Sequence, residues 1–93
     1  MASIDYEGFK SWLASSDRLS ARAITDTVSR LKRADSIVAL RDYVDIGPYL
    51  EVLIGEQNWI VIAEVSRPGI IRASRMYFLY RNMQKSNSVS DIG

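Results

Sequence analysis

Residues 66–83, SRPGIIRASRMYFLYRNM, combine a helix start signal with a broad apolar stripe, and this combination favours an all-α fold. Ser66 is a favourable N-cap and Pro68 suits a first helical turn, so a helix is predicted from about Pro68 to Met83. Its apolar side comprises Ile70, Ala73, Met76, Tyr77, Leu79 and Tyr80. A stripe this wide is typical of a helix at the centre of a bundle. The aromatic residues, expected in the core rather than as base-stacking platforms, are Tyr77, Phe78 and Tyr80.

A second helix is predicted from about Ala21 to Ser36, with Ser20 as its N-cap. Its apolar stripe comprises Ile24, Val28 and Leu31. At about 100° per residue, the face opposite this stripe carries polar and basic side chains. They are Arg22, Ser29, Arg30 and Arg33. Asp26 lies on the same face, four residues from both Arg22 and Arg30, and can pair with either of them.

The remaining apolar patterns predict further helices. One is expected near residues 5–15, ended by a polar turn at 15–17, and another near 46–55 with Pro48 in its first turn. Residues 59–65 are rich in β-branched side chains, so they suit either a short helix, which we favour, or one strand of a hairpin at about 50–65. The predicted fold is a compact all-α bundle of four or five helices, and the hairpin would make it α+β.

Composition excludes several classes of protein. The chain has 93 residues and a mass of 10.5 kDa, enough for one small domain, and it contains no cysteine and no histidine. Disulfides, thiolate or imidazole metal sites, cysteine nucleophiles and histidine acid–base catalysis are therefore excluded. The sequence contains no P-loop, GxGxxG, HExxH or nucleophile-elbow motif, and Asp42 and Asp45 are interpreted as surface charge. We expect no catalytic activity in this chain and no cofactor.

The net charge of +1 conceals an uneven distribution. Residues 1–17 sum to −2, residues 18–33 to +4, residues 34–64 to −5 and residues 65–93 to +4. Nine of the twelve basic residues are arginine, whose guanidinium fork suits phosphate groups. If both basic blocks face one way, the domain has a basic face in spite of its near-neutral total. Otherwise, they are two solvated helix faces.

Four segments follow one another in a recognisable order: FKSWL at 9–13, LSARAI at 19–24, VSRLKR at 28–33 and IRASRMYFLY at 71–80. This order resembles the SAM-like N-terminal, core-binding domain of phage integrases and other tyrosine recombinases. In that family an F..WL helix precedes LS..T...Y...L, and a helix of the type ALR.Y..F closes the bundle. The pattern Ser-Arg-x-x-Arg, at Ser29, Arg30 and Arg33, also resembles a pattern in small helical modules that precede bacterial defence nucleases.

The resemblance implies a SAM-like bundle that holds DNA without cleaving it. In tyrosine recombinases this domain clamps one side of the duplex, and a separate C-terminal domain carries the catalytic histidine, arginines and tyrosine. A chain without histidine would then be the non-catalytic, DNA-holding part of a larger integrase-like or defence-related protein. The implied partners are double-stranded DNA and further domains of the same polypeptide.

The charge pattern points to a set of DNA-contacting residues. They are Ser20, Arg22, Ser29, Arg30, Arg33, Arg72, Arg75 and Arg81. Free backbone amides at residues 20–23 are expected to add a phosphate site at the start of the second helix. The alternative is a protein-interaction or inhibitor module whose acidic middle segment meets a basic partner. That segment carries Asp42, Asp45, Glu51 and Glu56.

The chain is expected to form a single helical domain over residues 1–83. Residues 84–93 are polar and serine-rich, and they are predicted to be a flexible tail or a linker. Neither a signal-peptide pattern nor a membrane-spanning apolar run is visible, so the cytoplasm is the default localisation. The sequence does not specify an oligomeric state.

Overall fold

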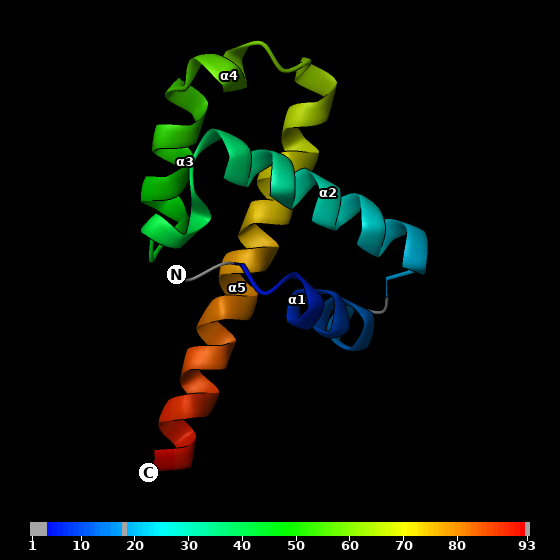
Figure 1. Cartoon of the computed structure of the whole chain (residues 1–93), viewed down its shortest axis with the longest axis vertical. Coiled ribbons are helices and arrows are strands. Elements are labelled where there is room, and N and C mark those ends of the chain that lie inside the picture. Colours follow the sequence, from blue (N-terminus) through cyan, green and yellow to red (C-terminus); the bar gives the residue numbers. More distant parts are fainter. Residues whose placement is uncertain (1–3, 18, 93) are drawn as a thin grey trace.

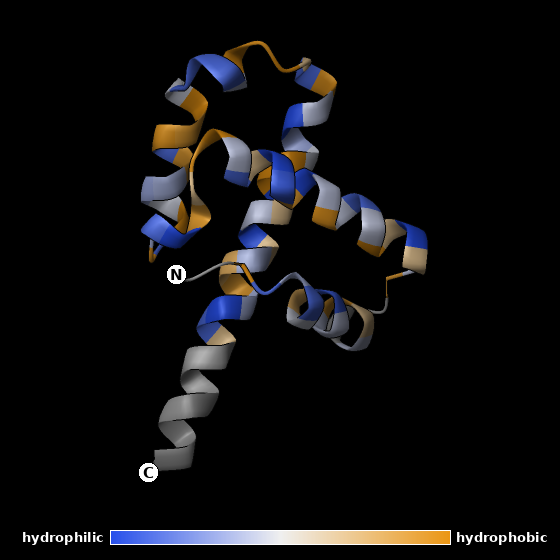
Figure 2. Ribbon diagram, viewed as in Figure 1, coloured by the Kyte–Doolittle hydropathy of each residue, from blue (hydrophilic) through white to orange (hydrophobic). Residues whose placement is uncertain are grey.

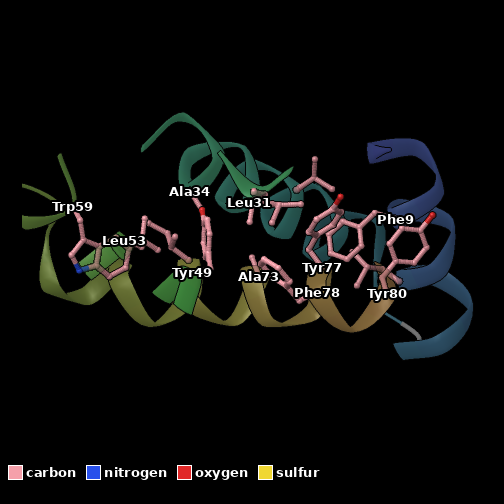
Figure 3. Close-up of a cluster of buried hydrophobic side chains, with 14 of the residues drawn as sticks. Phe9, Leu31, Ala34, Tyr49, Leu53, Trp59, Ala73, Tyr77, Phe78 and Tyr80 are labelled. Carbon is pink, nitrogen blue, oxygen red and sulfur yellow. The ribbon is translucent and has the colours of Figure 1, made fainter. Parts of the chain in front are cut away.

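The long helix α5 (Arg67–Ile92) is the axis against which the other helices pack (Figure 1). The structure is a computed structural model that describes residues 4–17 and 19–92, with side chains for 4–15 and 19–83. Helix α2 (Ala21–Ile37) crosses over α5, and this pair makes the largest contact between helices. Along α5, the α3–α4 region lies toward the first turns and α1 toward later turns (Figures 1 and 3).

The buried side of α5 follows the predicted stripe at four positions, while Met76 is half-buried and Leu79 is exposed. Its buried residues are Ile70, Ala73, Ser74, Tyr77, Phe78 and Tyr80. Leu79, which was expected in the core, is 54% exposed, whereas Phe78 is buried as expected. The buried Ser74 hydroxyl donates to the carbonyl of Ile70 one turn earlier, so it needs no partner from another helix.

The C-terminal bound of α5 differs from the sequence-based prediction. The helix runs to Ile92, beyond the end predicted near Met83. Residues 84–92 hold good helix formers such as Gln84 and Lys85 and no proline or glycine, so no residue there stops the helix. Their side chains and residue 93 lie outside the described part of the chain, and the flexibility expected of 84–93 stays a prediction.

Helix α1 (Tyr6–Trp12) continues into one π-helical turn over Leu13–Asp17. Asp5 caps the helix, because its Oδ1 accepts a hydrogen bond of 2.9 Å from the amide of Gly8. Phe9 and Leu13 are fully buried, and the Phe9 ring packs against Tyr77 and Tyr80 of α5. The predicted helix at 5–15 is thus confirmed, and its polar ending takes the form of a wide turn.

Helix α2 has the cap and the core stripe that its sequence predicts. The Ser20 hydroxyl accepts a hydrogen bond of 3.2 Å from the amide of Ala23. The buried positions are Thr27, Val28, Leu31 and Ala34, while Ile24 is half-buried. After α2 the chain extends, and the Asp35 carboxylate accepts from the amide of Leu40, which fixes the start of the following 3-10 turn (Leu40–Asp42).

The segment that could have formed a hairpin is helical. Helix α3 (Ile46–Gly55) is followed by the short α4 (Gln57–Ile60) and a 3-10 turn (Glu64–Ser66) that leads into α5. Trp59 and Ile62 are buried three residues apart, and Val61 between them points to solvent, which is a helical rather than an alternating pattern. The hairpin alternative is therefore wrong, and residues 4–17 and 19–92 form an all-α globule with five α-helices and no strand.

One continuous apolar core joins all five helices (Figure 3). Aromatic rings dominate it: the Phe9 ring centroid lies 5.7 Å from those of Tyr77 and Tyr80, and Tyr49 lies 5.5 Å from Phe78. The expectation that the aromatics of α5 belong to the core is confirmed. The Tyr49 hydroxyl donates to the carbonyl of Val38 at 2.8 Å, and burial raises the pKa of this phenol. Within the part of the chain that the structure describes, no helix is long and apolar enough to cross a membrane.

Candidate nucleic-acid interface

The crossing of α2 and α5 brings the two basic segments of the sequence together. At the crossing, Gly69 of α5 leaves room for the side chain of Arg30 from α2. A Cβ atom at position 69 would lie 3.0 Å from Nε of Arg30 and 3.2 Å from its Cδ. The arginine therefore lies across the first turns of α5, so that its guanidinium belongs to the surface of both helices.

A pocket of about 180 Å³ opens on one side of Arg30. It is lined by Leu19, Ala23, Asp26, Thr27, Arg30, Gly69, Arg72, Ala73 and Met76. Arg30 and Arg72 come from different basic blocks, forty-two positions apart in the sequence, and both border this one hollow. The two blocks thus share a face here, a point that the sequence left open.

A second pocket, of about 250 Å³, lies on the other side of Arg30. Its lining comprises Ser29, Arg30, Arg33, Val65, Ser66, Gly69 and Ile70. We refer to the two pockets together as the arginine groove. Of the eight residues predicted to contact DNA, the groove contains Ser29, Arg30, Arg33 and Arg72.

Arg22 and Arg75 lie on the exposed surface but line neither pocket. Arg22 precedes Arg30 by about two turns of α2, or roughly 12 Å along the helix axis. Arg75 is one turn beyond Arg72 and about 60° from it around α5. Both side chains can therefore extend the basic surface beyond the ends of the groove.

The cap at Ser20 uses one of the amides that the sequence suggested as a phosphate site at the start of α2. Its hydroxyl oxygen accepts the hydrogen bond from the amide of Ala23, and its carbonyl accepts from the amide of Ile24. The amide of Ala23, expected to be free, is thus occupied by the cap. A capping serine and a bound anion would compete for the same backbone amides, and here the cap uses the amide of Ala23.

Arg81 is built into the fold and lies away from the arginine groove. Its guanidinium donates to the carbonyl of Leu40 at 3.1 Å and to that of Tyr43. It also lies over the ring of Phe78, 4.9 Å from the centroid. It lies nine positions after Arg72, which places the two about 180° apart around α5. This arginine ties the 3-10 turn after α2 to α5.

Two further cations of the basic blocks also have structural partners. Arg67 donates to the carbonyls of Ile60 at 2.7 Å and Ile62 at 3.1 Å, and it lies over the ring of Trp59. Lys32 lies 5.1 Å from the centroid of the Tyr6 ring. Nothing in the local sequence distinguishes these side chains from the surface arginines, since their partners come from other elements.

Asp26 borders the first pocket without making the ion pair expected with Arg22 or Arg30. Among the side chains described, the ion pairs are Lys10 with Glu7 at 3.7 Å and Arg41 with Asp42 at 4.0 Å. The guanidinium groups of the groove are therefore not held by any carboxylate of the described side chains, though Asp26 lowers the positive potential between them. No three acidic side chains of the described residues converge as a metal site would require.

Comparison with known proteins adds no relative. The chain matches no protein-family model, no curated protein and no solved structure. What is shown is the all-α, five-helix fold of the described residues. The resemblance to the core-binding domain of tyrosine recombinases stays a prediction based on its motifs.

Proposed function

We propose that this chain is a non-catalytic DNA-binding module that holds the backbone of a duplex against the arginine groove. The observation that carries the proposal is the position of Arg30 over Gly69, between two pockets that also contain Arg33 and Arg72. Because these arginines come from two crossing helices, their guanidinium groups form a surface rather than a single row. Such a surface can contact phosphates along the axis of α2 and also along the axis of α5.

The dimensions of α2 suit a phosphate backbone. From Arg22 to Arg33 the helix rises about 16 Å, and one DNA strand carries a phosphate about every 3.4 Å of duplex axis. Several phosphates therefore lie within reach of Arg22, Arg30 and Arg33. Guanidinium groups bind phosphate oxygens in pairs, and the exposed hydroxyl of Ser29 can donate one more hydrogen bond.

Binding of this kind would position the duplex rather than identify its sequence. The aromatic side chains of α5 that could stack on bases are buried in the core. Five exposed arginines of α2 and α5 are available to phosphates, and they are Arg22, Arg30, Arg33, Arg72 and Arg75. With five contacts the logarithm of the binding constant would fall with the logarithm of salt concentration with a slope of about −4.5.

The same surface supports a holding role within a larger integrase-like or defence-related protein. The chain has no histidine or cysteine for acid–base or nucleophilic chemistry, and Asp26 is the one carboxylate of the described residues that lines the groove. Strand cleavage would therefore be the work of another domain, with residues 84–93 leading toward it. The groove would supply affinity and orientation to that domain.

The test is a fluorescence-anisotropy titration of a labelled duplex of about 20 base pairs, at about 50 and 200 mM salt. For a slope near −4.5, affinity should fall about 500-fold between these two concentrations. Circular dichroism at both salt concentrations establishes that the helices stay intact. A folded chain that does not bind the duplex at about 50 mM salt would rule the proposal out.

A further inference from the structure

The corner formed by α3, α4 and the 3-10 turn before α5, residues 51–65, exposes an unusual amount of apolar surface. The large apolar side chains exposed there are Val52, Ile54, Ile60, Val61 and Val65. Val61 is 74% exposed and Val65 90% exposed. In Figure 2, apolar colour covers parts of α3 and the connection from α4 to α5, at the end of the molecule away from α1. We call this surface the α3–α4 corner.

The backbone that carries the exposed side chains of Ile60 and Val61 is held by buried neighbours and by hydrogen bonds. Trp59 and Ile62 are buried, and the guanidinium of Arg67 donates to the carbonyls of Ile60 and Ile62. Ile60 and Val61 lie between these fixed points and cannot turn inward without breaking them. A surface fixed in this way loses little conformational entropy when a partner covers it.

The charges around the corner point to the chemistry of that partner. Residues 51–65, the corner itself, contain three acidic residues and no lysine or arginine. All three are exposed, and they are Glu51, Glu56 and Glu64. A second copy docked through this same face would bring carboxylates against carboxylates, and an anionic membrane surface would be repelled as well. A cationic partner is the one whose charge complements this rim.

We propose that the α3–α4 corner binds a basic amphipathic helix of a partner protein. The apolar stripe of that helix would cover Ile60, Val61 and Val65, and its flanking lysines or arginines would face Glu56 and Glu64. Helices recognised in this way present apolar anchors at positions i, i+3, i+4 and i+7. The proposal does not depend on DNA binding, because Ile60 and Val61 line neither pocket of the arginine groove, and only Val65 borders it.

The experiment uses the full chain and three labelled helical peptides of about 18 residues. The first carries a leucine stripe at i, i+3, i+4 and i+7 with lysine elsewhere. The second has the same composition without the stripe, and the third has glutamate in place of lysine. We expect the first peptide to bind roughly tenfold more tightly than either of the others in an anisotropy titration. Amide shifts in ¹⁵N spectra should map its site to residues 51–65.

A variant pair locates the contact. Ile60→Ser with Val61→Ser removes exposed apolar groups only, so the fold should persist, and binding of the striped peptide should weaken at least about fivefold. The matched control, Leu79→Ser with Met83→Ser, removes two exposed apolar side chains of α5 outside the corner and should leave binding unchanged. Val65 is left intact because it also borders the arginine groove.

Three outcomes would overturn the proposal. Equal binding of the striped and unstriped peptides would mean that charge alone attracts them, and amide shifts confined to α2 and α5 would place the contact elsewhere. Sedimentation that shows the protein itself dimerising, with dimers lost in the Ile60→Ser, Val61→Ser variant, would make a second copy the occupant. Each of these results leaves the DNA titration unaffected, so the two proposals fail separately.

Discussion

The hydroxyl of Tyr80 donates a hydrogen bond of 3.2 Å to Oδ2 of Asp5, the residue whose other carboxylate oxygen caps α1. The Asp5 side chain thus caps α1 and also links it to Tyr80 of α5, which is seventy-five positions away in the sequence. Gly8 lies where these groups meet, since a Cβ atom there would contact both Asp5 Oδ2 and the Tyr80 hydroxyl. This close approach explains a glycine inside a short helix, where alanine would otherwise be preferred.

Gly8→Ala should therefore destabilise the protein by about 1 kcal/mol. The helix propensity of alanine would contribute up to about 1 kcal/mol of stability, but displacing the cap and the Tyr80 hydrogen bond costs about 2 kcal/mol together. The control is Gly47→Ala in the first turn of α3, where a Cβ atom has nothing within 4 Å and stability should rise slightly. Urea unfolding measures both, and equal gains from the two substitutions would contradict this account.

Stability should decline at alkaline pH. Burial raises the pKa of Tyr6, Tyr49 and Tyr80 above the ordinary 10.0, and the hydrogen bond to Asp5 raises that of Tyr80 further. Above pH 10 the unfolded chain loses phenolic protons that the folded chain keeps. The free energy of unfolding therefore has its full value below pH 10 and decreases as the pH rises beyond it. Urea unfolding at about pH 8 and 11 measures the decline.

Tyr49→Phe tests the contribution of the most deeply buried of these phenols. At about pH 8 it should cost about 1 kcal/mol, because the carbonyl of Val38 loses its hydrogen bond. Between about pH 8 and 11, however, the variant should lose less stability than the parent chain, since one titrating phenol is absent. An identical decline in both proteins would show that Tyr49 does not contribute to it.

Arg81→Ala should cost about 2–3 kcal/mol of stability. The guanidinium donates to the carbonyls of Leu40 and Tyr43 in a partly buried site, and hydrogen bonds from charged donors are stronger than those from neutral ones. Arg75→Ala, at an exposed position of the same helix, should change stability by less than about 0.5 kcal/mol.

The same two variants separate structural from phosphate-contacting arginines. In the salt titration, Arg75→Ala should make the slope shallower by about one unit, while folded Arg81→Ala should keep the parent slope. Arg81→Lys should not restore stability, because a single ammonium group does not reproduce the two-pronged contact. A shallower slope for Arg81→Ala would show that this arginine contacts DNA.

Reversing charge in the arginine groove should abolish DNA binding and leave the fold intact. Arg30→Glu with Arg33→Glu places two carboxylates where phosphates are expected to lie, and both positions are exposed. The matched control, Lys10→Glu with Arg41→Glu, changes the net charge by the same amount outside the groove. Anisotropy titrations at about 50 mM salt compare the three proteins, and the groove is the wrong surface if both variants lose affinity equally.

Asp26→Asn should strengthen DNA binding about two- to fivefold. Its carboxylate lines the pocket shared by Arg30 and Arg72, where it repels an incoming phosphate. An energy of about 0.5–1 kcal/mol for a surface charge corresponds to that range of affinity. Glu56→Gln makes the same change of charge in the α3–α4 corner and should have a smaller effect. If the two variants gain equally, net charge rather than position governs the affinity.

Local patterns predicted the helices well because cap, periodicity and breaker signals depend on near neighbours. Ser20 caps α2 as expected, and the buried face of α2 contains Val28 and Leu31. The prediction was wrong at Leu79, one of two adjacent apolar residues of α5. Leu79 is exposed, whereas Phe78 is buried as expected and packs against the ring of Tyr49.

The candidate site was less predictable, since a charged side chain shows its role only through its partner. Arg81 and Arg75 are alike in the sequence, but Arg81 meets two carbonyls from the turn after α2, about forty positions away. Ser20 was predicted as both a cap and a DNA contact, and the cap occupies its hydroxyl. No pattern within one helix distinguishes these cases.

The amino-acid sequence by itself determined the fold class, the helix starts and the absence of histidine and cysteine chemistry, because each of these depends on composition or on spacing within one turn. Only the tertiary structure decided which cations bind carbonyls of the fold and which face solvent. The crossing of α2 over α5 at Gly69 brings Arg30 beside Arg72 and leaves Arg81 on the opposite side of α5. Such a crossing depends on how two apolar stripes pack against each other, a relation between helices that neither helix encodes alone.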